Sequence, residues 1–237
     1  MKPKISVILP TYNERENIGR LVERIFRSVN DSLQIIVVDD DSPDGTWKVV
    51  QEIAERDNRV RLLRRVGRRG LRSALVEGIS LAEGEIVVWM DCDFSMPPEI
   101  VPHLVREIGA FDIVVGSRYV EGGKDARDSR FRVVTSRWFD RFGSLVLQSP
   151  VRDITSGFVA AKKELFDDIN LSGTYGDYCI DFLYRAVRRG FKVKEIPYTN
   201  MPRWKGKTKT NPNIFKFLKY GWIYTLTVLR LRFHGGS

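Results

Sequence analysis

The chain has 237 residues, enough for one large domain with a substantial hydrophobic core. Hydrophobic residues make up 43% and charged residues 29%, which excludes a disordered chain. The two cysteines, Cys92 and Cys179, are too few for a disulfide framework or a cysteine-based zinc site. The net charge of +9 indicates an anionic partner, and the scarcity of cysteine fits a reducing, cytosolic compartment.

The first half of the chain alternates predicted strands and helices. The apolar run at residues 5–9 is too short for a signal peptide and is expected to form a buried strand. Asn13 and Glu16 have the spacing of a capping box for a helix that runs to about Ser28. Further strands are predicted at residues 34–38, 60–63, 85–90 and 113–115, and helices at 46–56 and 71–82. This order predicts a mainly parallel sheet with helices on both faces.

Polar clusters follow four of these strands where each strand ends, at residues 11–14, 39–42, 91–95 and 116–118. Ligands of such sheets bind at the carboxyl ends of the strands. The sequence therefore predicts one ligand site along this edge.

Asp91 and Asp93 are separated by one residue directly after an apolar strand. Hard carboxylate oxygens suit Mg²⁺ or Mn²⁺, which takes one or two carboxylates together with phosphate oxygens. Such an ion would neutralise a diphosphate leaving group. The alternative is a pair of solvated acids at a strand end. Cys92, between them, is expected in the core.

Asp39, Asp40 and Asp41 place three like charges together, which is unfavourable unless a ligand or water compensates them. Asp39 and Asp40 are candidates for contacts to the base or ribose of a nucleotide. The alternative is turn formation, because residues 41–45 (DSPDG) are typical of a β-turn. Candidates for phosphate contacts are Arg118, Arg137, Arg203 and Lys209.

The second half is less regular. A helix with interleaved arginines is predicted at residues 133–147, another at 182–189, a short strand at 192–196 and a basic loop at 205–210. We expect a catalytic domain over residues 1–210 and a basic amphipathic tail over 211–237.

Basic residues dominate the end of the chain. After Glu195 there are eight lysines and arginines and no acidic residue, so this segment carries nearly all of the +9 net charge. Residues 220–229 are uncharged, but ten residues are too few to cross a bilayer, which takes about 20. Aromatic residues flanked by basic ones favour a helix lying in the headgroup region of a membrane. The alternative is a C-terminal helix docked on the core with a basic outer face.

Taken together, these motifs resemble glycosyltransferase family 2, and within it the dolichyl-phosphate mannose synthases. The matching segments are residues 5–14 (ISVILPTYNE), 36–46 (IVVDDDSPDGT), 70–74 (GLRSA), 77–78 (EG), 91–99 (DCDFSMPPE), 116–119 (GSRY), 136–137 (SR), 153–158 (DITSGF) and 203–209 (RWKGKTK). The chain departs from the family pattern at Asp41, at Met96 and at residues 179–181. These departures concern the sugar and the acceptor more than the fold.

The resemblance implies a GT-A fold and assigns roles to particular residues. Pro10, Tyr12, Glu14 and Asp40 would line the nucleotide site, and Asp91, Asp93 and Ser95 would hold the metal and diphosphate. Arg118, Ser136, Arg137, Arg203 and Lys209 would hold phosphates, including that of a polyprenyl acceptor. Asp181 corresponds to an acidic position on the acceptor side. We thus expect Asp93, Arg118 and Asp181 to be the catalytic residues.

The resemblance implies inverting, metal-dependent transfer of a hexose, mannose from GDP-mannose being favoured, to dolichyl or polyprenyl phosphate. A lipid phosphate is already an anion, so positioning and stabilisation of the leaving group would suffice. Alternatives are UDP-glucose or UDP-GlcNAc as donor, or a glycan hydroxyl acceptor with Asp181 as base. A non-enzymatic membrane- or nucleic-acid-binding module leaves the strand-end aspartates unexplained. We expect no nucleic acid partner. The protein is expected at the cytoplasmic face of a membrane, held there peripherally by its tail or by a small anchor subunit.

Overall fold

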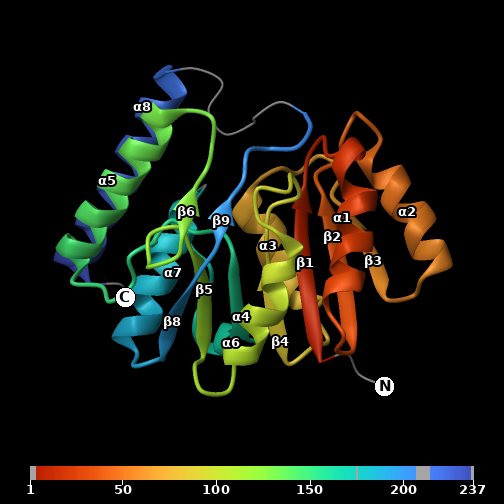
Figure 1. The fold of residues 1–237 in the computed structure, drawn as a ribbon, viewed down its shortest axis with the longest axis horizontal. Coiled ribbons are helices and arrows are strands. Elements are labelled where there is room, and N and C mark those ends of the chain that lie inside the picture. Colours follow the sequence, from red (N-terminus) through yellow and green to blue (C-terminus); the bar gives the residue numbers. More distant parts are fainter. Residues whose placement is uncertain (1–3, 175, 207–213, 236–237) are drawn as a thin grey trace.

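The computed structural model describes residues 4–174, 176–206 and 214–235. A seven-stranded sheet with the order β3-β2-β1-β4-β7-β5-β8 forms its centre (Figure 1). Its strands are β1 (Ile5–Thr11), β2 (Leu33–Asp39), β3 (Val60–Arg64), β4 (Ile86–Trp89), β5 (Ile113–Ser117), β7 (Val159–Lys162) and β8 (Val193–Pro197). Strand β7 is antiparallel to β4 and β5, and the other pairs are parallel. The predicted mainly parallel α/β fold is confirmed.

Helices cover both faces of this sheet. They are α1 (Arg15–Ser28), α2 (Thr46–Arg56), α3 (Leu71–Ser80), η1 (Pro98–Ile100), α4 (Val101–Glu107), α5 (Arg130–Leu147), α6 (Leu165–Asp168), α7 (Asp177–Arg188) and α8 (Ile214–His234). Two short strands, β6 (Lys124–Asp125) and β9 (Thr199–Asn200), form a separate ribbon. Helices α5 and α8 lie side by side at one end of the sheet, and α1 and α2 at the other (Figure 1).

The side chains of β1 show why two cores form. Ile8 packs in a cluster with residues of α3 and α7, whereas its neighbours Val7 and Leu9 pack in a second cluster with α1 and α4. Successive residues of a strand point to opposite faces, so an apolar strand such as β1 fills both cores.

The strand register brings the polar clusters together. Thr11, at the end of β1, pairs with Asp39 at the end of β2, and Ile8 pairs with Trp89 of β4, two residues before Asp91. Parallel strands that end at the same level place their following loops along one edge.

The predicted capping box is wrong. Helix α1 begins at Arg15, and Glu14 at its N-cap makes no side-chain capping bond. Asn13 has a φ of 55°, and its N–H donates to Ser42 Oγ at 2.9 Å. The loop after β2 therefore fixes Asn13, outside the helix.

Helix α8 confirms the predicted C-terminal helix. Val228 and Leu231 are buried in the core shared with α7, and α8 also contacts α5. Gly143 permits close approach here, because a Cβ at this position would lie 2.5 Å from Ile154 Cδ1 and 3.5 Å from Val228 Cγ2. No helix in the described part of the chain combines the length and hydropathy needed to span a bilayer. The boundary at residue 210 falls outside the described residues and stays a prediction.

Candidate active site

A cavity of about 1110 Å³ opens between the carboxyl ends of the strands and helices α5 and α8. The predicted site residues that line it are Pro10, Tyr12, Glu14, Asp40, Asp91, Asp93, Ser95, Arg118, Ser136 and Arg203. The polar clusters that follow separate strands in the sequence thus face one space.

Asp93 is 8% exposed and is held on both carboxylate oxygens. The Ser95 N–H donates to its Oδ1 at 3.0 Å, and Arg203 Nη2 lies 2.9 Å from its Oδ2. Arg203 Nη1 also donates to Glu14 Oε1 at 2.9 Å. Burial disfavours the charged guanidinium, but Asp93 and Glu14 outweigh that effect and raise the pKa of Arg203 above its usual value.

The segment that carries Arg203 lies directly on the turn that carries Asp93. Met201 N–H donates to the Ser95 carbonyl at 2.9 Å, and Trp204 N–H donates to the Asp93 carbonyl at 3.0 Å. The Trp204 ring meets Phe94 edge-on at 5.3 Å. Phe94 has a φ of 63°, so the chain turns sharply directly after the two aspartates.

Asp39 and Asp40 play different structural parts. Asp39 is fully buried, does not line the cavity, and accepts hydrogen bonds from Thr11 Oγ1 at 2.9 Å and from the Ser42 N–H at 2.8 Å. This is the turn chemistry that the DSPDG segment indicates. Asp40 lines the cavity, and its Oδ1 accepts from Arg65 Nε at 2.8 Å. Burial raises the pKa of Asp40, although the Gly70 N–H and Arg65 oppose the shift.

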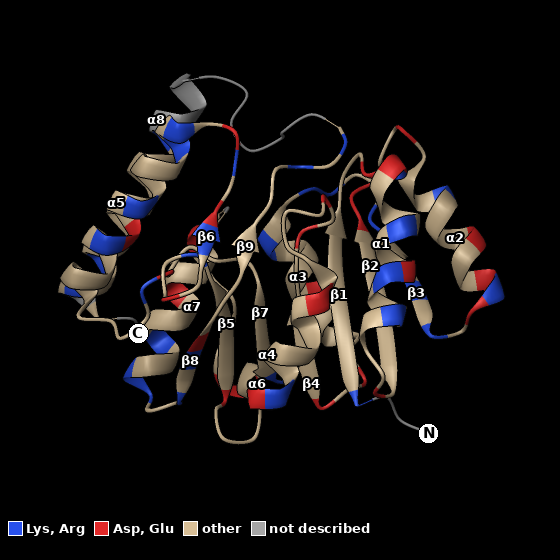
Figure 2. Ribbon diagram, viewed as in Figure 1, with Lys and Arg blue, Asp and Glu red and all other residues tan. Residues whose placement is uncertain are grey.

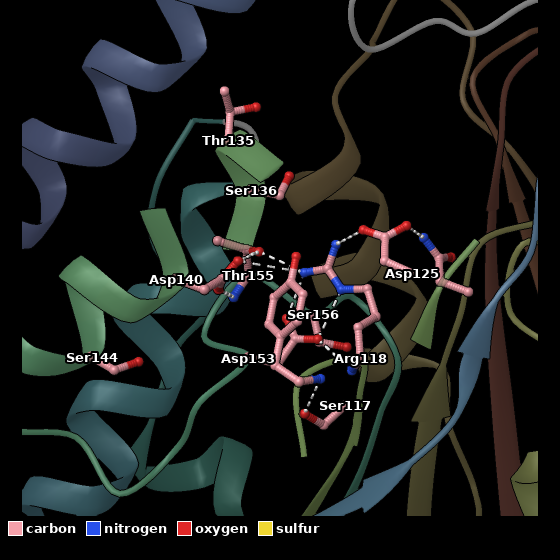
Figure 3. Close-up of polar contacts among 12 residues, drawn as sticks. Ser117, Arg118, Asp125, Thr135, Ser136, Asp140, Ser144, Asp153, Thr155 and Ser156 are labelled. Atoms are coloured by element: carbon pink, nitrogen blue, oxygen red, sulfur yellow. Dashed lines mark hydrogen bonds and ion pairs between the residues drawn. The ribbon is translucent and has the colours of Figure 1, made fainter. Parts of the chain in front are cut away.

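Arg118 lies in a buried cluster of charges (Figure 3). Its Nε donates to Asp153 Oδ2 at 2.8 Å and its Nη2 to Thr155 Oγ1 at 2.9 Å. Its Nη2 is 3.6 Å from Asp140 Oδ2 on α5, and its Nη1 is 3.8 Å from Asp125 Oδ2 on β6. Three separate segments therefore meet at one guanidinium.

The acidic and basic side chains of this cluster largely neutralise one another. Burial and the nearby Asp153 raise the pKa of Asp140 well above its usual value, and Arg118 opposes this only in part. Burial acts against the ionised form of Asp125 too, but Arg127 at 2.6 Å outweighs it and lowers the pKa of that carboxyl. Asp153 and Asp140 hold the pKa of Arg118 well above its usual value despite burial. Arg118 thus forms part of the cavity wall as a fixed cation.

Several predicted residues lie away from the cavity. Arg137 is exposed on α5 and does not line the cavity. Asp181 on α7 is 3% exposed and its Oδ2 accepts from Arg185 Nε at 2.8 Å, while Arg230 of α8 lies 3.5 Å from its Oδ1. Lys209 lies outside the described residues. The roles of these three residues stay predictions.

Several residues that line the cavity were not among those predicted from the sequence. Arg69, Arg127 and Arg132 are the basic ones. Arg69 belongs to a glycine-flanked basic loop after β3, and Arg127 and Arg132 to an arginine-rich stretch around the start of α5. Basic residues next to a strand-end loop were a usable signal. Tyr198 and Asn200, by contrast, reach the cavity from the far end of the sheet, which local pattern could not indicate.

Comparison with known proteins decides the family. Residues 6–169 match the family description "Glycosyl transferase family 2". The chain belongs to glycosyl transferase family 2. This family 2 chain shares 37% identity over 228 residues with the dolichol-phosphate mannosyltransferase of Pyrococcus furiosus, covering 94% of this chain and 63% of that one. It shares 36% identity over 228 residues with the polyprenol monophosphomannose synthase of Mycolicibacterium smegmatis, covering 91% and 86%. The chain thus spans less than two thirds of its archaeal relative.

Solved structures establish the fold of this family 2 chain. Glucosyl-3-phosphoglycerate synthase from Mycobacterium tuberculosis, in complex with Mn²⁺, UDP and glucosyl-3-phosphoglycerate, superposes with a TM-score of 0.72 at 21% identity, covering 97% of this chain and 80% of that chain. The same enzyme with Mg²⁺ and UDP gives a TM-score of 0.70 at 22% identity, covering 97% and 79%. The likeness confirms the expected GT-A-like architecture.

Proposed function

We propose that this protein transfers a hexose, with mannose from GDP-mannose favoured, to a polyprenyl phosphate such as dolichyl phosphate. One observation carries the proposal. The cavity joins strand-end carboxylates, on the side of β1, β2 and β4, to α5 and α8, which expose large apolar side chains. A soluble nucleotide sugar and a lipid phosphate can thus approach one space from different sides. The names of the two relatives support mannose and a polyprenyl acceptor.

The donor side fits a divalent cation. Asp91 and Asp93 both line the cavity, and two carboxylates plus phosphate oxygens suit Mg²⁺ or Mn²⁺. Among the described residues no group of three or more His, Cys, Asp or Glu side chains is arranged for a metal, so the nucleotide and water would supply the other ligands. Such an ion would stabilise the charge of the leaving diphosphate. Pro10, Tyr12, Glu14 and Asp40 would bind the nucleoside, and Ser95 would orient Asp93 through its N–H.

The acceptor side would bind the lipid phosphate. Arg118 and Ser136 line the cavity, and so does Arg203, which pairs with Asp93. A phosphate monoester oxygen is anionic near neutral pH, so it could displace the nucleoside diphosphate directly and invert the anomeric carbon. The arginines would position the attacking oxygen and stabilise charge on both reactants. No general base is needed in this scheme.

An apolar face supports binding to a membrane surface. Helix α5 exposes Phe131, Val134, Trp138, Phe142 and Leu145, and α8 exposes Trp222, Leu226, Leu229 and Phe233. Residues three and four apart lie on one side of a helix, so each set forms a stripe. Basic residues are spaced along α5 between these side chains (Figure 2). Large apolar side chains among basic ones suit the headgroup region of an anionic bilayer. We infer peripheral binding at a cytoplasmic face, with or without a small anchor subunit.

A transfer assay tests the proposal. The protein is incubated with Mn²⁺ or Mg²⁺, dolichyl phosphate and a panel of GDP and UDP sugars, and sugar in the organic phase is measured. We expect transfer from GDP-mannose that chelation of the metal abolishes. Absence of transfer from every donor, with Asp93→Ala behaving like the wild type, would refute the lipid phosphate as acceptor. Transfer from UDP-glucose or UDP-GlcNAc alone would support the lipid phosphate as acceptor and contradict GDP-mannose as donor.

A hydroxyl acceptor is the second candidate and requires a carboxylate base. Asp181, the residue considered for that role, does not line the cavity and is paired with Arg185, which favours the phosphate acceptor. The two candidates differ in their pH profiles. A hydroxyl acceptor requires a carboxylate base in addition to the carboxylates that would hold the metal, so its rate falls as that base is protonated, whereas a phosphate acceptor requires no such base.

A further inference from the structure

Arg65 is a buried arginine directly after β3, and it has no role in the donor or acceptor binding proposed above. Its side chain is fully buried. Its Nε donates to Asp40 Oδ1 at 2.8 Å, its Nη1 to Ser73 Oγ at 3.0 Å, and its Nη2 to the Gly70 carbonyl at 3.3 Å. A buried guanidinium with this many partners is a fixed part of the fold.

Asp40 and Arg65 together hold both sides of Gly70. Asp40 Oδ2 accepts from the Gly70 N–H at 2.8 Å, while Arg65 binds the Gly70 carbonyl. Gly70 has a φ of +141°, a conformation that L side chains rarely adopt. The loop between β3 and α3 is thus fixed at its last residue, and the backbone of Arg69 is fixed with it.

Arg69, next to this fixed point, lines the cavity. Its guanidinium carbon lies 4.5 Å from the centre of the Tyr12 ring. Arg118, Arg127 and Arg203, which line the same cavity, each have carboxylate partners. Arg69 has no carboxylate within ion-pair distance among the described residues. Within the described residues, no carboxylate therefore neutralises the positive charge of Arg69, which lies next to Tyr12 in the cavity.

We infer that Arg69 binds a phosphate of the nucleoside diphosphate and that Arg65 is the positioning residue that holds it over Tyr12. The inference rests on the proposed function, because it assumes a nucleotide at this end of the cavity. A nucleoside diphosphate brings more negative charge than one divalent cation neutralises. An arginine stacked on an aromatic ring keeps its N–H groups free to meet phosphate oxygens.

Calorimetric titration with GDP and UDP in the presence of Mn²⁺ tests this role. Arg69→Gln should weaken binding of the preferred nucleotide roughly tenfold, the effect of losing one charge-assisted hydrogen bond. The loss should shrink at high salt, because salt screens an exposed charge. Arg68→Gln is the matched control: Arg68 is adjacent and exposed, but it pairs with Glu77 and does not line the cavity. Equal affinities of the Arg69→Gln and Arg68→Gln proteins, or a loss independent of salt, would overturn the inference.

The positioning role of Arg65 needs a readout that loss of stability alone would not change. Arg65→Lys keeps the charge but loses the planar guanidinium that binds several partners at once. Gly70→Ala strains the backbone next to Arg69 without altering a charge. Each should weaken GDP binding, and neither should add to the loss caused by Arg69→Gln, as measured in a double-mutant cycle. Additive losses of binding free energy in both cycles would show that Arg65 does not position Arg69. If the wild type binds neither nucleotide, the proposed function fails; if it binds one and Arg69→Gln binds it equally, only this inference fails.

Discussion

Arg203 and Arg118 form similar ion pairs in two regions of the cavity that differ in burial. On the donor side, the side chain of Arg203 is 22% exposed and that of its partner Asp93 is 12% exposed. On the acceptor side, Arg118 is 9% exposed and Asp153 is 0%. A buried ion pair cannot lose one partner without leaving an uncompensated charge, whereas a partly exposed pair can exchange its partner for water or phosphate. Arg203 can therefore exchange partners more readily than Arg118, whose buried pair stays in place.

The largest expected effect breaks the buried pair. Arg118→Met should lower the free energy of unfolding by about 3–5 kcal/mol, because Asp153 and its neighbours lose their buried cation. Arg203→Met should lower it by about 1–3 kcal/mol, because Arg203 itself is partly exposed while its partners Asp93 and Glu14 have little access to water. Urea denaturation of both variants measures the difference. Similar losses would mean that burial does not distinguish the two regions.

Catalytic activity should depend most on the other region, around Asp93. Asp93→Ala should reduce sugar transfer on the order of 100-fold or more, because charge on the leaving diphosphate loses its stabilisation. Asp41→Ala is the control, because Asp41 pairs with Arg64 and does not line this cavity. Rates in the organic-phase assay give the ratio. A comparable loss in both variants would point to a general effect of removing an aspartate near the strand ends.

The apolar face should matter for membranes and little for folding. Trp138→Ser on α5 and Phe233→Ser on α8 replace side chains that are 71% and 75% exposed. Each should weaken binding to vesicles containing anionic lipid by about tenfold, because a large apolar group no longer leaves water. Flotation with such vesicles measures the binding. Val66→Ser is the control, being 66% exposed at the opposite end of the sheet. If it weakens binding as much, α5 and α8 are not the membrane face.

The smallest effect concerns pH. The raised pKa of Asp140 means that its stabilising contribution is complete at low pH and declines as the pH rises towards the folded-state pKa. Asp140→Asn removes this dependence but disturbs the hydrogen bonds from Thr155. The variant should be about 1 kcal/mol less stable than the wild type near pH 4, and the gap should narrow towards pH 8. Urea denaturation across this range decides it; a gap that widens with pH would contradict the raised pKa.

Local pattern predicted the framework of the donor side. Apolar strands, helical periodicity and polar strand ends were read in order, and helix α2 was placed at its observed bounds. The turn interpretation of Asp39 also follows from neighbours three residues away. Strand β7 was missed, because four residues inserted antiparallel between β4 and β5 carry no distinctive local signal.

The acceptor side depended on contacts that cross the chain. Arg118 was singled out by its place after a strand, but Asp125, Asp140 and Asp153 were not grouped with it, since the last of them lies 35 residues away. The apolar side chains of α5 had the period of a core helix. Which of them are exposed is decided by Gly143 and Asp140, which turn the other side of the helix inward.

The sequence by itself determined the α/β class, the strand-end positions of Asp91 and Asp93, and the basic, aromatic C-terminal helix, because each depends on spacing within a few residues. Only the tertiary structure decided that Asp93 shares Arg203 with Glu14, that Arg118 is fixed in a buried acidic cluster, and that Arg69 stands over Tyr12. Those facts depend on how distant segments pack and on which charges that packing removes from water, and burial is a property of the whole fold.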